Sequence, residues 1–274
     1  NNPITQRNLE GLRSLGYHIM DPAEGWLACG ITGVGRLPEP EAIVDWLEAK
    51  MCSTNELEGT TILVTAGGTQ ESIDPVRYIG NRSSGKMGYA IAEQAARMGA
   101  KVILVSAPTS LPIPSGVDFI SVDSAVSMQE AVEARYNDVN VVIMAAAVSD
   151  FRVLHKAEQK IKKMESMTIE LVKNPDILQG LGSKKNHQIL VGFAAETEHV
   201  IKYGQDKVAR KNLDMLVAND VSKSNAGFNV DTNEGYFLYP DKEPKEMPNM
   251  KKSELARHIL REVIDLVANK ADIN

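Results

Sequence analysis

The chain has 274 residues, of which 43% are hydrophobic and 24% charged, an ordinary globular composition with enough length for one or two domains. Its formal net charge of −6 excludes a protein that coats nucleic acid, so we expect no nucleic-acid partner and look for any anion site in a local basic cluster. No apolar run approaches the ~18 residues of a membrane span, so we expect no membrane partner either.

Residues 1–50 show helical patterns without an accompanying series of strands. We predict a helix from Gln6 to Leu15, a glycine-rich turn region at 28–36 and an amphipathic stretch from Pro40 to Ala49. Such a segment can hardly bury a core alone, so we interpret it as the end of a preceding domain. The first residue is not Met, which agrees with a piece of a longer protein. Residues 51–60 are polar and aperiodic, as in a linker.

The two cysteines, Cys29 and Cys52, have neither CxxC spacing nor a histidine run beside them. This pattern indicates neither a disulfide framework nor a zinc site, and it fits a reducing, cytoplasmic location. The sequence assigns no residue as a metal ligand.

From residue 61 to residue 270, short apolar runs alternate with helical patterns. The runs are 62–66, 102–105, 141–146, 189–193 and 215–218. Continuous apolarity is typical of strands covered on both faces, as in parallel sheets. We therefore predict an α/β fold: a doubly wound, Rossmann-like, mostly parallel sheet with helices on both faces and ligands at the carboxyl ends of its strands.

Three further elements complete this prediction. Met87, Ile91, Ala95 and Met98 recur at helical spacing and are followed by Gly99, a candidate C-cap. Residues 227–239 resemble an added β-hairpin with its turn at 231–233, and residues 253–267 a closing helix.

The segment 67–88, which follows the first predicted strand, is dense in Gly, Ser and Thr and opens a helix near Ser84. Free N–H groups and a helix N-terminus therefore converge where an anion can bind. The alternative is a long glycine-rich surface turn, but Arg77, Asn81 and Lys86 favour a phosphate site.

Three known phosphate motifs do not fit this segment. Gly80 to Lys86 matches half of a P-loop, but Met87 stands where a metal-binding Ser or Thr belongs. A dinucleotide fold requires GxGxxG directly after the strand and an acidic residue at the end of strand two, and both are missing. The catalytic-loop signatures of protein kinases are missing as well.

A second cluster follows the third predicted strand. Small residues at 145–147 allow close approach of a ring or ribose, and Asp150 offers an acceptor for hydroxyl groups. The lysine-rich run 156–163 is either a solvated face or a mobile flap that brings cations to a polyphosphate. Asn174 to Ile177 predicts a helix start, and Lys207 and Lys211 share one helix face.

Together these stretches resemble the phosphopantothenoylcysteine synthetase half of the bifunctional coenzyme A biosynthesis protein, over nearly all of residues 60–268. The matching segments are 65–69, 73–79, 81, 83–88, 146–148, 160–163, 172–177, 192–197, 211–214 and 218–221. Residues 1–50 resemble the end of the decarboxylase half of that protein. These likenesses imply domain limits of 1–50, 51–60 and 61–270.

The resemblance implies an acid–amino-acid ligase. The carboxylate of 4′-phosphopantothenate attacks the α-phosphate of CTP, which releases pyrophosphate, and the amine of cysteine then displaces CMP. Asn81, Arg77 and Lys160 are the implied catalytic residues, with Mg²⁺ bridging the triphosphate. The residues expected around the nucleotide are Gly67, Ser83, Ser84, Gly85, Lys86, Met144, Ala145, Ala146, Asp150, Lys160, Pro175, Asp176, Ile177, Leu178, Phe193, Lys207 and Lys211. The resemblance also implies a homodimer.

Cys29 resembles the family's decarboxylase proton donor, but the FMN-binding strands that would precede it are not part of these 274 residues. We therefore expect no decarboxylase activity from them. A different class of function remains open, namely a catalytically silent relative that binds nucleotide as a regulatory subunit. Asn81, Lys86, Lys160 and Lys211 together favour the enzyme.

Overall fold

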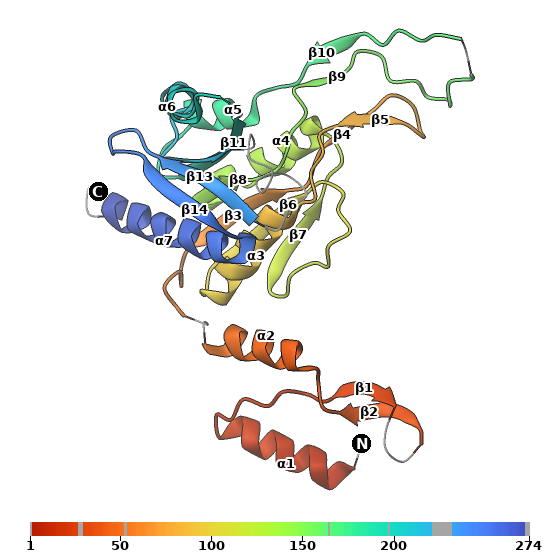
Figure 1. The fold of residues 1–274 in the computed structure, drawn as a ribbon, viewed down its shortest axis with the longest axis vertical. Coiled ribbons are helices and arrows are strands. Elements are labelled where there is room, and N and C mark those ends of the chain that lie inside the picture. Colours follow the sequence, from red (N-terminus) through yellow and green to blue (C-terminus); the bar gives the residue numbers. More distant parts are fainter. Residues whose placement is uncertain are drawn as a thin grey trace. The chain divides into compact units, whose positions relative to one another are not determined.

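The computed structural model describes residues 2–26, 30–51, 54–163, 165–196, 198–220 and 232–271 (Figure 1). The chain divides into two compact units, Asn1–Ser53 and Thr54–Asn274.

The first unit contains two helices and a two-stranded sheet. Helix α1 (Pro3–Ser14) begins after Asn2, whose Oδ1 accepts a hydrogen bond from the Ile4 amide at 2.9 Å, and α2 spans Pro40–Met51. Both helices confirm the predicted ones. Strands β1 (Ala23–Trp26) and β2 (Thr32–Arg36) pair antiparallel.

These two strands correct the expectation of a turn without strands at 28–36. The glycines suggested a turn, but strand pairing uses backbone groups, which glycine supplies as well as any residue: Gly25 pairs with Gly33. Cys29 lies outside the described residues, so its role stays a prediction.

The second unit is built on an eight-stranded sheet in the order β14-β13-β12-β11-β8-β3-β6-β7. The strands are β3 (Thr61–Ala66), β6 (Lys101–Ser106), β7 (Val117–Ser121), β8 (Val141–Met144), β11 (Ile189–Glu196), β12 (Met215–Asp220), β13 (Thr232–Leu238) and β14 (Lys245–Lys251). The strands from β7 to β12 in this order are mutually parallel, whereas β13 and β14 are antiparallel to their neighbours. This arrangement confirms the predicted doubly wound, mostly parallel sheet.

Helices cover both faces of the sheet, as the continuous apolar runs predicted (Figure 1). Alternate residues of β3 point to opposite faces: Ile62 and Val64 belong to one buried cluster and Leu63 to the other. The first cluster includes residues of α3 (Lys86–Arg97) and α7 (Lys252–Ala271). The second includes residues of α4 (Ala125–Glu133), η1 (Tyr136–Asp138), α5 (Ile177–Ser183) and α6 (Val200–Arg210).

The predicted hairpin at 227–239 is misplaced. Thr232 and Asn233, expected in its turn, lie in β13, and the chain turns at 239–244 before β14. Burial alternates along β13, but its first two buried positions are Asn233 and Gly235, so the sequence shows no apolar alternation there. Residues 227–231 lie outside the described part of the chain.

Two short antiparallel ribbons extend from the same end of this unit (Figure 1). One pairs β4 (Gln70–Ser72) with β5 (Tyr78–Gly80), and the other pairs β9 (Phe151–Val153) with β10 (Leu171–Lys173). The first ribbon lies within the segment predicted as a glycine-rich loop.

Candidate functional site

The loops that follow β3 and β8 are joined to each other by backbone pairing. The Ala147 amide donates to the Gly67 carbonyl at 2.8 Å, and the Thr69 amide donates to the Ala147 carbonyl at 3.2 Å. Gly67 has φ +79°, and a Cβ there would lie 2.7 Å from the Ala107 oxygen, so only glycine fits this first turn. The carboxyl edge of the sheet therefore carries a fixed backbone framework.

Two buried threonines hold the second of these loops in place. Thr65 Oγ1 accepts from the Ala146 amide at 3.1 Å, and Thr69 Oγ1 accepts from the Ser149 amide at 2.9 Å. Both threonines are completely buried. Two side-chain hydrogen bonds thus fix the backbone of the small residues that follow β8.

Asn81 reaches this loop from the other side. Its Nδ2 donates to the Val148 carbonyl at 3.1 Å, while the side chain remains exposed to solvent. Asn81 also lines a cavity, and its side-chain amide carries both a donor and an acceptor group.

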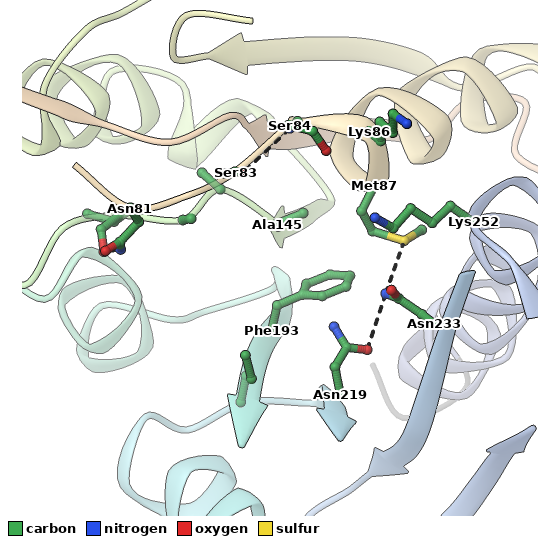
Figure 2. A pocket seen from close by; sticks show the side chains of 16 residues that line it. Asn81, Ser83, Ser84, Lys86, Met87, Ala145, Phe193, Asn219, Asn233 and Lys252 are labelled. Carbon is green, nitrogen blue, oxygen red and sulfur yellow. Dashed lines mark hydrogen bonds between the residues drawn. The ribbon is translucent and has the colours of Figure 1, made fainter. Parts of the chain in front are cut away.

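This first cavity has a volume of about 240 Å³ (Figure 2). Its lining combines the starts of α3 and α7, the loop after β8, the ends of β11 and β12 and the start of β13. The lining residues are Asn81, Ser83, Ser84, Gly85, Lys86, Met87, Ala145, Ala146, Ala147, Val148, Phe193, Ala194, Ala195, Asn219, Asn233 and Lys252.

A second cavity, of about 380 Å³, lies on the other side of the loop after β8. Its walls come from that loop, the start of α5 and the end of α6. The lining residues are Met144, Ala146, Val148, Ser149, Asp150, Lys173, Asn174, Pro175, Asp176, Ile177, Leu178, Phe193, Lys207, Arg210 and Lys211. The two cavities share Ala146, Val148 and Phe193, so these residues form a common wall.

The second cavity is strongly charged. Lys207 pairs with Glu196, and Lys211 Nζ lies 2.9 Å from the carboxylate of Asp176. Burial of Asp176 opposes ionisation, but the hydrogen bond from Lys211 and the Gln179 amide together bring its pKa below the ordinary value. The lining as a whole carries four cations, Lys173, Lys207, Arg210 and Lys211, against two carboxylates, those of Asp150 and Asp176, which suits a polyanionic ligand.

Asn174, which directly follows β10, and Arg152 hold the end of that strand against the loop that carries Asp150. Asn174 Nδ2 donates to the Ser149 carbonyl at 2.8 Å, and the Asp150 carbonyl accepts from the Asn174 amide at 2.8 Å. Arg152 Nη1 donates to Asn174 Oδ1 at 3.1 Å. Sequence reasoning treated Asn174 only as part of a helix start, because its contacts join residues 22 to 25 positions apart.

Two predicted catalytic residues, Arg77 and Lys160, line neither cavity. Arg77 pairs with the buried Asp74 and donates to the Ile161 carbonyl at 3.0 Å, next to the exposed Lys160. The Arg77 guanidinium keeps the pKa of Asp74 far below its usual range. Arg77 thus anchors the segment that carries Lys160, and the catalytic roles of both residues stay predictions.

The other predicted site residues divide between the two cavities, except Gly67, which lines neither. Ser83, Ser84, Gly85, Lys86 and Ala145 line only the first. Met144, Asp150, Lys207, Lys211 and the segment 175–178 line only the second. Ala146 and Phe193 line both. Sequence reasoning missed Asn219, Asn233, Lys252 and Arg210, which come from the last third of the chain.

Among the described residues, no three histidine, cysteine, aspartate or glutamate side chains gather in a way that could hold a metal ion. In the same part of the chain, we find no helix with the length and apolarity needed to span a bilayer.

A parallel sheet with two cavities at its carboxyl edge, one cationic and both bordered by helix starts, defines a doubly wound α/β protein whose carboxyl edge suits an anionic ligand. The sequence model of the DNA/pantothenate metabolism flavoprotein C-terminal domain matches residues 57–267. The chain belongs to this family.

Curated relatives agree with this assignment. The chain is 47% identical to the coenzyme A biosynthesis bifunctional protein CoaBC of Bacillus subtilis over 268 residues, which cover 96% of the chain and 66% of that protein. It is 46% identical to the Escherichia coli protein of the same name, covering 95% of the chain and 65% of that protein. The chain therefore spans about two thirds of the length of these relatives.

Solved structures share the fold. The crystal structure of the C-terminal domain of a CoaBC protein matches with a TM-score of 0.69 and 44% identity, covering 79% of this chain and 100% of that one. A Cab2 mutant in complex with phosphopantothenate-cysteine matches with a TM-score of 0.61 and 18% identity, covering 86% and 96% of the two chains. At that identity the second match shows the fold alone.

Proposed function

We propose that this protein is a phosphopantothenate–cysteine ligase of coenzyme A biosynthesis that uses CTP and forms an acyl-cytidylate intermediate. The observation that carries the proposal is the pair of cavities with one common wall. A ligase of this kind must bring a nucleoside triphosphate and a carboxylic acid together at one phosphorus atom. The names of the 47% and 46% identical relatives, both bifunctional proteins of coenzyme A biosynthesis, support the same reaction.

The second cavity suits the nucleotide. Small residues on the shared wall, with Phe193, allow a base or ribose to approach closely, and Asp150 can accept a hydrogen bond from a ribose hydroxyl. Lys207, Arg210 and Lys211 supply positive charge for the phosphates. The preference for CTP comes from the family resemblance, and no side chain of the cavity is assigned to the base.

The first cavity suits the acid. We therefore assign Ser83, Ser84, Gly85 and Lys86 to the acid rather than to the triphosphate, which revises the expectation from sequence. The two substrates then meet at the common wall, where Asn81 is anchored on the Val148 carbonyl. From there its amide can hydrogen-bond to the acyl-cytidylate while the cysteine amine attacks.

Magnesium fits this arrangement as an ion held chiefly by the triphosphate. Asp150 and Asp176 are the carboxylates in the second cavity, and no cluster of three metal-binding side chains exists among the described residues. Mg²⁺ commonly keeps several waters and binds one or two carboxylates together with substrate phosphates. It would neutralise charge on the triphosphate, while the cavity's own cations orient the α-phosphate.

The direct test is a coupled pyrophosphate assay with 4′-phosphopantothenate and each of the four nucleoside triphosphates, with and without cysteine. With 4′-phosphopantothenate and CTP but without cysteine, we expect about one equivalent of pyrophosphate per active site. Addition of cysteine should then give continuous turnover. Absence of pyrophosphate with every nucleotide would refute the ligase and favour the catalytically silent relative.

Replacing Asn81 separates the two half-reactions. Asn81→Asp should leave CTP binding and the first pyrophosphate release largely intact but stall cysteine addition, so that the acyl-cytidylate accumulates and is detected by mass spectrometry. Asn137→Asp, the same change at an exposed position in η1, serves as the control. Failure to detect the intermediate would remove Asn81 from this role.

A substitution of Lys160 tests the role of the ribbon formed by β9 and β10. If the flap brings its ammonium to the triphosphate, Lys160→Gln should slow pyrophosphate release strongly without changing stability, because the side chain is exposed. An unchanged rate of pyrophosphate release would show that the lysine-rich run 156–163 is only a solvated surface.

The predicted homodimer also remains a proposal. Exposed apolar side chains on the two ribbons, among them Val76, Tyr78 and Phe151, support an interface there. Light scattering of the wild type and a Tyr78→Ser variant would test it, and a wild-type monomer would refute it.

A further inference from the structure

The lysine-rich run is hydrogen-bonded to the turn between β4 and β5, on the neighbouring ribbon (Figure 1). The Ala157 amide donates to the Ile73 carbonyl at 2.9 Å, and the Ile161 amide donates to Asp74 Oδ2 at 3.1 Å. Lys160 lies between these two bonded positions, and its side chain is exposed. The backbone that carries Lys160 is therefore held on both sides, while the side chain itself extends into solvent.

Asp74 divides its two carboxylate oxygens between two sets of donors. Oδ1 accepts from the amides of Val76 and Arg77, at 2.8 and 2.9 Å, and so shapes the turn itself. Oδ2 accepts from the Ile161 amide at 3.1 Å and from Arg77 Nε at 3.0 Å. Asp74 is only 2% exposed, so these donors replace the water that a carboxylate otherwise needs.

Both ribbons are continuous with the proposed site. Strand β9 directly follows Asp150, and β10 leads directly into Asn174, and these two residues line the second cavity. Strand β5 leads directly into Asn81. The lysine-rich run is thus connected to the proposed nucleotide cavity at both ends, and the turn that holds it belongs to the ribbon that carries Asn81.

We propose that Asp74 is a positioning residue for the first half-reaction: through Oδ2 it holds the lysine-rich run where the Lys160 ammonium can contact the triphosphate. This inference rests on the proposed function, which assigns Lys160 to pyrophosphate release. Asp74 lines neither cavity, so it acts on the nucleotide only through another group. A lysine on a fixed backbone has less freedom to lose when it contacts a ligand. The contribution of Asp74 should therefore disappear when the Lys160 ammonium is absent.

Asp74→Asn removes the contact to the run and spares the turn. The amide keeps an oxygen for the Val76 and Arg77 amides, but its NH₂ group replaces Oδ2 and faces the Ile161 N–H, which is also a donor. With 4′-phosphopantothenate and CTP but no cysteine, the first pyrophosphate should be released about tenfold more slowly than in the wild type. Asp118→Asn, the same change at an exposed position of β7, should leave this rate unchanged.

A double-mutant cycle with Lys160→Gln separates positioning from a general disturbance of the fold. In the Lys160→Gln background, Asp74→Asn should slow pyrophosphate release by less than about twofold, because residues that act as a unit are not additive. Equal slowing in both backgrounds would overturn the proposal, since Asp74 would then act without Lys160. An unchanged rate in folded Asp74→Asn, or in Lys160→Gln, would overturn it as well.

Hydrogen exchange tests the contact without the reaction. The Ile161 amide should exchange at least about tenfold faster in Asp74→Asn than in the wild type, whereas amides of β3 keep their protection. Unaltered exchange at Ile161 would overturn the proposal. If Asp74→Asn shows no cooperative thermal transition, Ala157→Pro removes the other backbone donor and leaves the turn intact. It should then slow pyrophosphate release only when Lys160 is present, and slowing without Lys160 would contradict the role of the contact.

The outcome for Asp74 is distinguishable from the outcome for the ligase. A wild type that releases pyrophosphate, with the two substitutions acting independently, would refute the positioning role alone. A wild type that releases none with any nucleotide would refute the ligase and with it this role. Faster exchange at Ile161 in Asp74→Asn would then keep the contact as a structural one.

Discussion

Two lysine–aspartate ion pairs lie at opposite edges of the central sheet and are alike in chemistry. Lys185 and Asp214 lie at the amino edge, 3.2 Å apart, with side chains 12% and 21% exposed. Lys211 and Asp176 lie at the carboxyl edge, 2.9 Å apart, with side chains 18% and 34% exposed. The surroundings of the two pairs differ.

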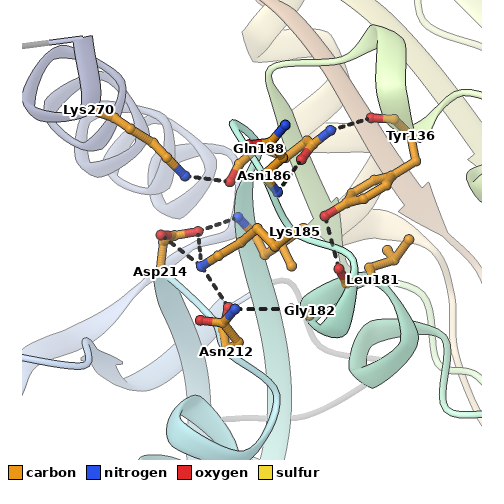
Figure 3. A network of polar contacts seen from close by, with 10 residues as sticks. Tyr136, Leu181, Gly182, Lys185, Asn186, Gln188, Asn212, Asp214 and Lys270 are labelled. Carbon is orange, nitrogen blue, oxygen red and sulfur yellow. Dashed lines mark hydrogen bonds and ion pairs between the residues drawn. The ribbon is translucent and has the colours of Figure 1, made fainter. Parts of the chain in front are cut away.

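At the amino edge, the pair is fully engaged by the protein (Figure 3). Asp214 Oδ2 also accepts from the Leu190 amide at 2.7 Å, and Lys185 Nζ also donates to the Asn212 carbonyl at 2.7 Å. The charges therefore hold the starts of β11 and β12 together.

Neighbouring contacts continue this network. Lys270 Nζ donates to the Gln188 carbonyl at 2.8 Å, and Tyr136 donates through its hydroxyl to the Leu181 carbonyl at 3.0 Å. Burial, with the nearby charge of Asp214, raises the pKa of Tyr136 to about 12. Burial also lowers the pKa of Lys270, which Asp214 partly offsets. These groups therefore stabilise the fold at the amino edge of the sheet.

At the carboxyl edge, both partners of the pair line the second cavity. An anionic ligand can therefore compete with Asp176 for the Lys211 ammonium. An ion pair alone therefore does not mark a functional site, whereas an ion pair that borders a cavity indicates one. Substitutions at the two edges should accordingly affect different properties.

Asp214→Ala should have the largest effect, and on stability. It leaves the partly buried Lys185 ammonium without its carboxylate and the Leu190 amide without a side-chain acceptor, which we expect to lower the free energy of unfolding by about 3 kcal/mol. Urea unfolding measures this change. Asp118→Ala, at an exposed position of β7, should change stability by less than ~0.5 kcal/mol. A similar loss in both variants would show that the network adds nothing beyond surface charge.

CTP affinity gives the complementary measurement on the same variant. The folded fraction of Asp214→Ala should bind CTP as the wild type does, because the amino edge lies away from both cavities. A large loss of CTP affinity would contradict the view that the ion pair at the amino edge is structural and only the pair at the carboxyl edge contacts the ligand.

Lys211→Met should instead affect CTP affinity more than stability. It should weaken CTP binding by about tenfold, or ~1.4 kcal/mol, because the triphosphate loses one cation, yet lower stability by less than ~1 kcal/mol. Titration calorimetry measures the CTP affinity, and urea unfolding measures the stability. Lys184→Met, an exposed lysine beyond the C-terminus of α5 that lines neither cavity, is the control. Unchanged CTP affinity in Lys211→Met would place the phosphates elsewhere.

The sequence was most informative about the sheet. The apolar runs at 62–66, 102–105, 141–146, 189–193 and 215–218 all coincide with strands, because burial on both faces leaves an unbroken apolar pattern. Strand β7 was not predicted: it is an edge strand whose residues are partly exposed, so its pattern is mixed.

For the site, the sequence identified the segments that follow the strands. It did not show which of these segments line the same cavity. Asn81 and Ala146 were recognised as local motifs, and the structure brings them to one cavity. Lys252 and Asn233 carry no local motif, since a lysine before a helix and an asparagine near a strand end are ordinary surface residues. Only the antiparallel addition of β13 and β14 to the sheet brings them to the cavity that α3 opens.

Asp176→Asn should have the smallest effect, and it isolates the contribution of the carboxylate to the ion pair at the carboxyl edge. Asn can still cap α5 by accepting from the Gln179 amide, where Asp176 Oδ1 now accepts at 3.1 Å, so stability should change little. Removing the carboxylate releases Lys211 for the ligand, and we expect CTP to bind about threefold more tightly.

The pH dependence of that ratio follows from the pKa of Asp176. Since the folded-state pKa is below the ordinary value of 3.8, the carboxylate is ionised from pH 8 down to pH 5, and its contribution to stability is lost only when the pH falls below that ordinary value toward the folded pKa. The ratio of wild-type to Asp176→Asn dissociation constants should therefore be constant over that range, because protonation of CTP itself cancels between the two proteins. A ratio that falls toward one at pH 5 would mean that Asp176 is already protonated there. The ion pair would then be too weak to compete with a triphosphate.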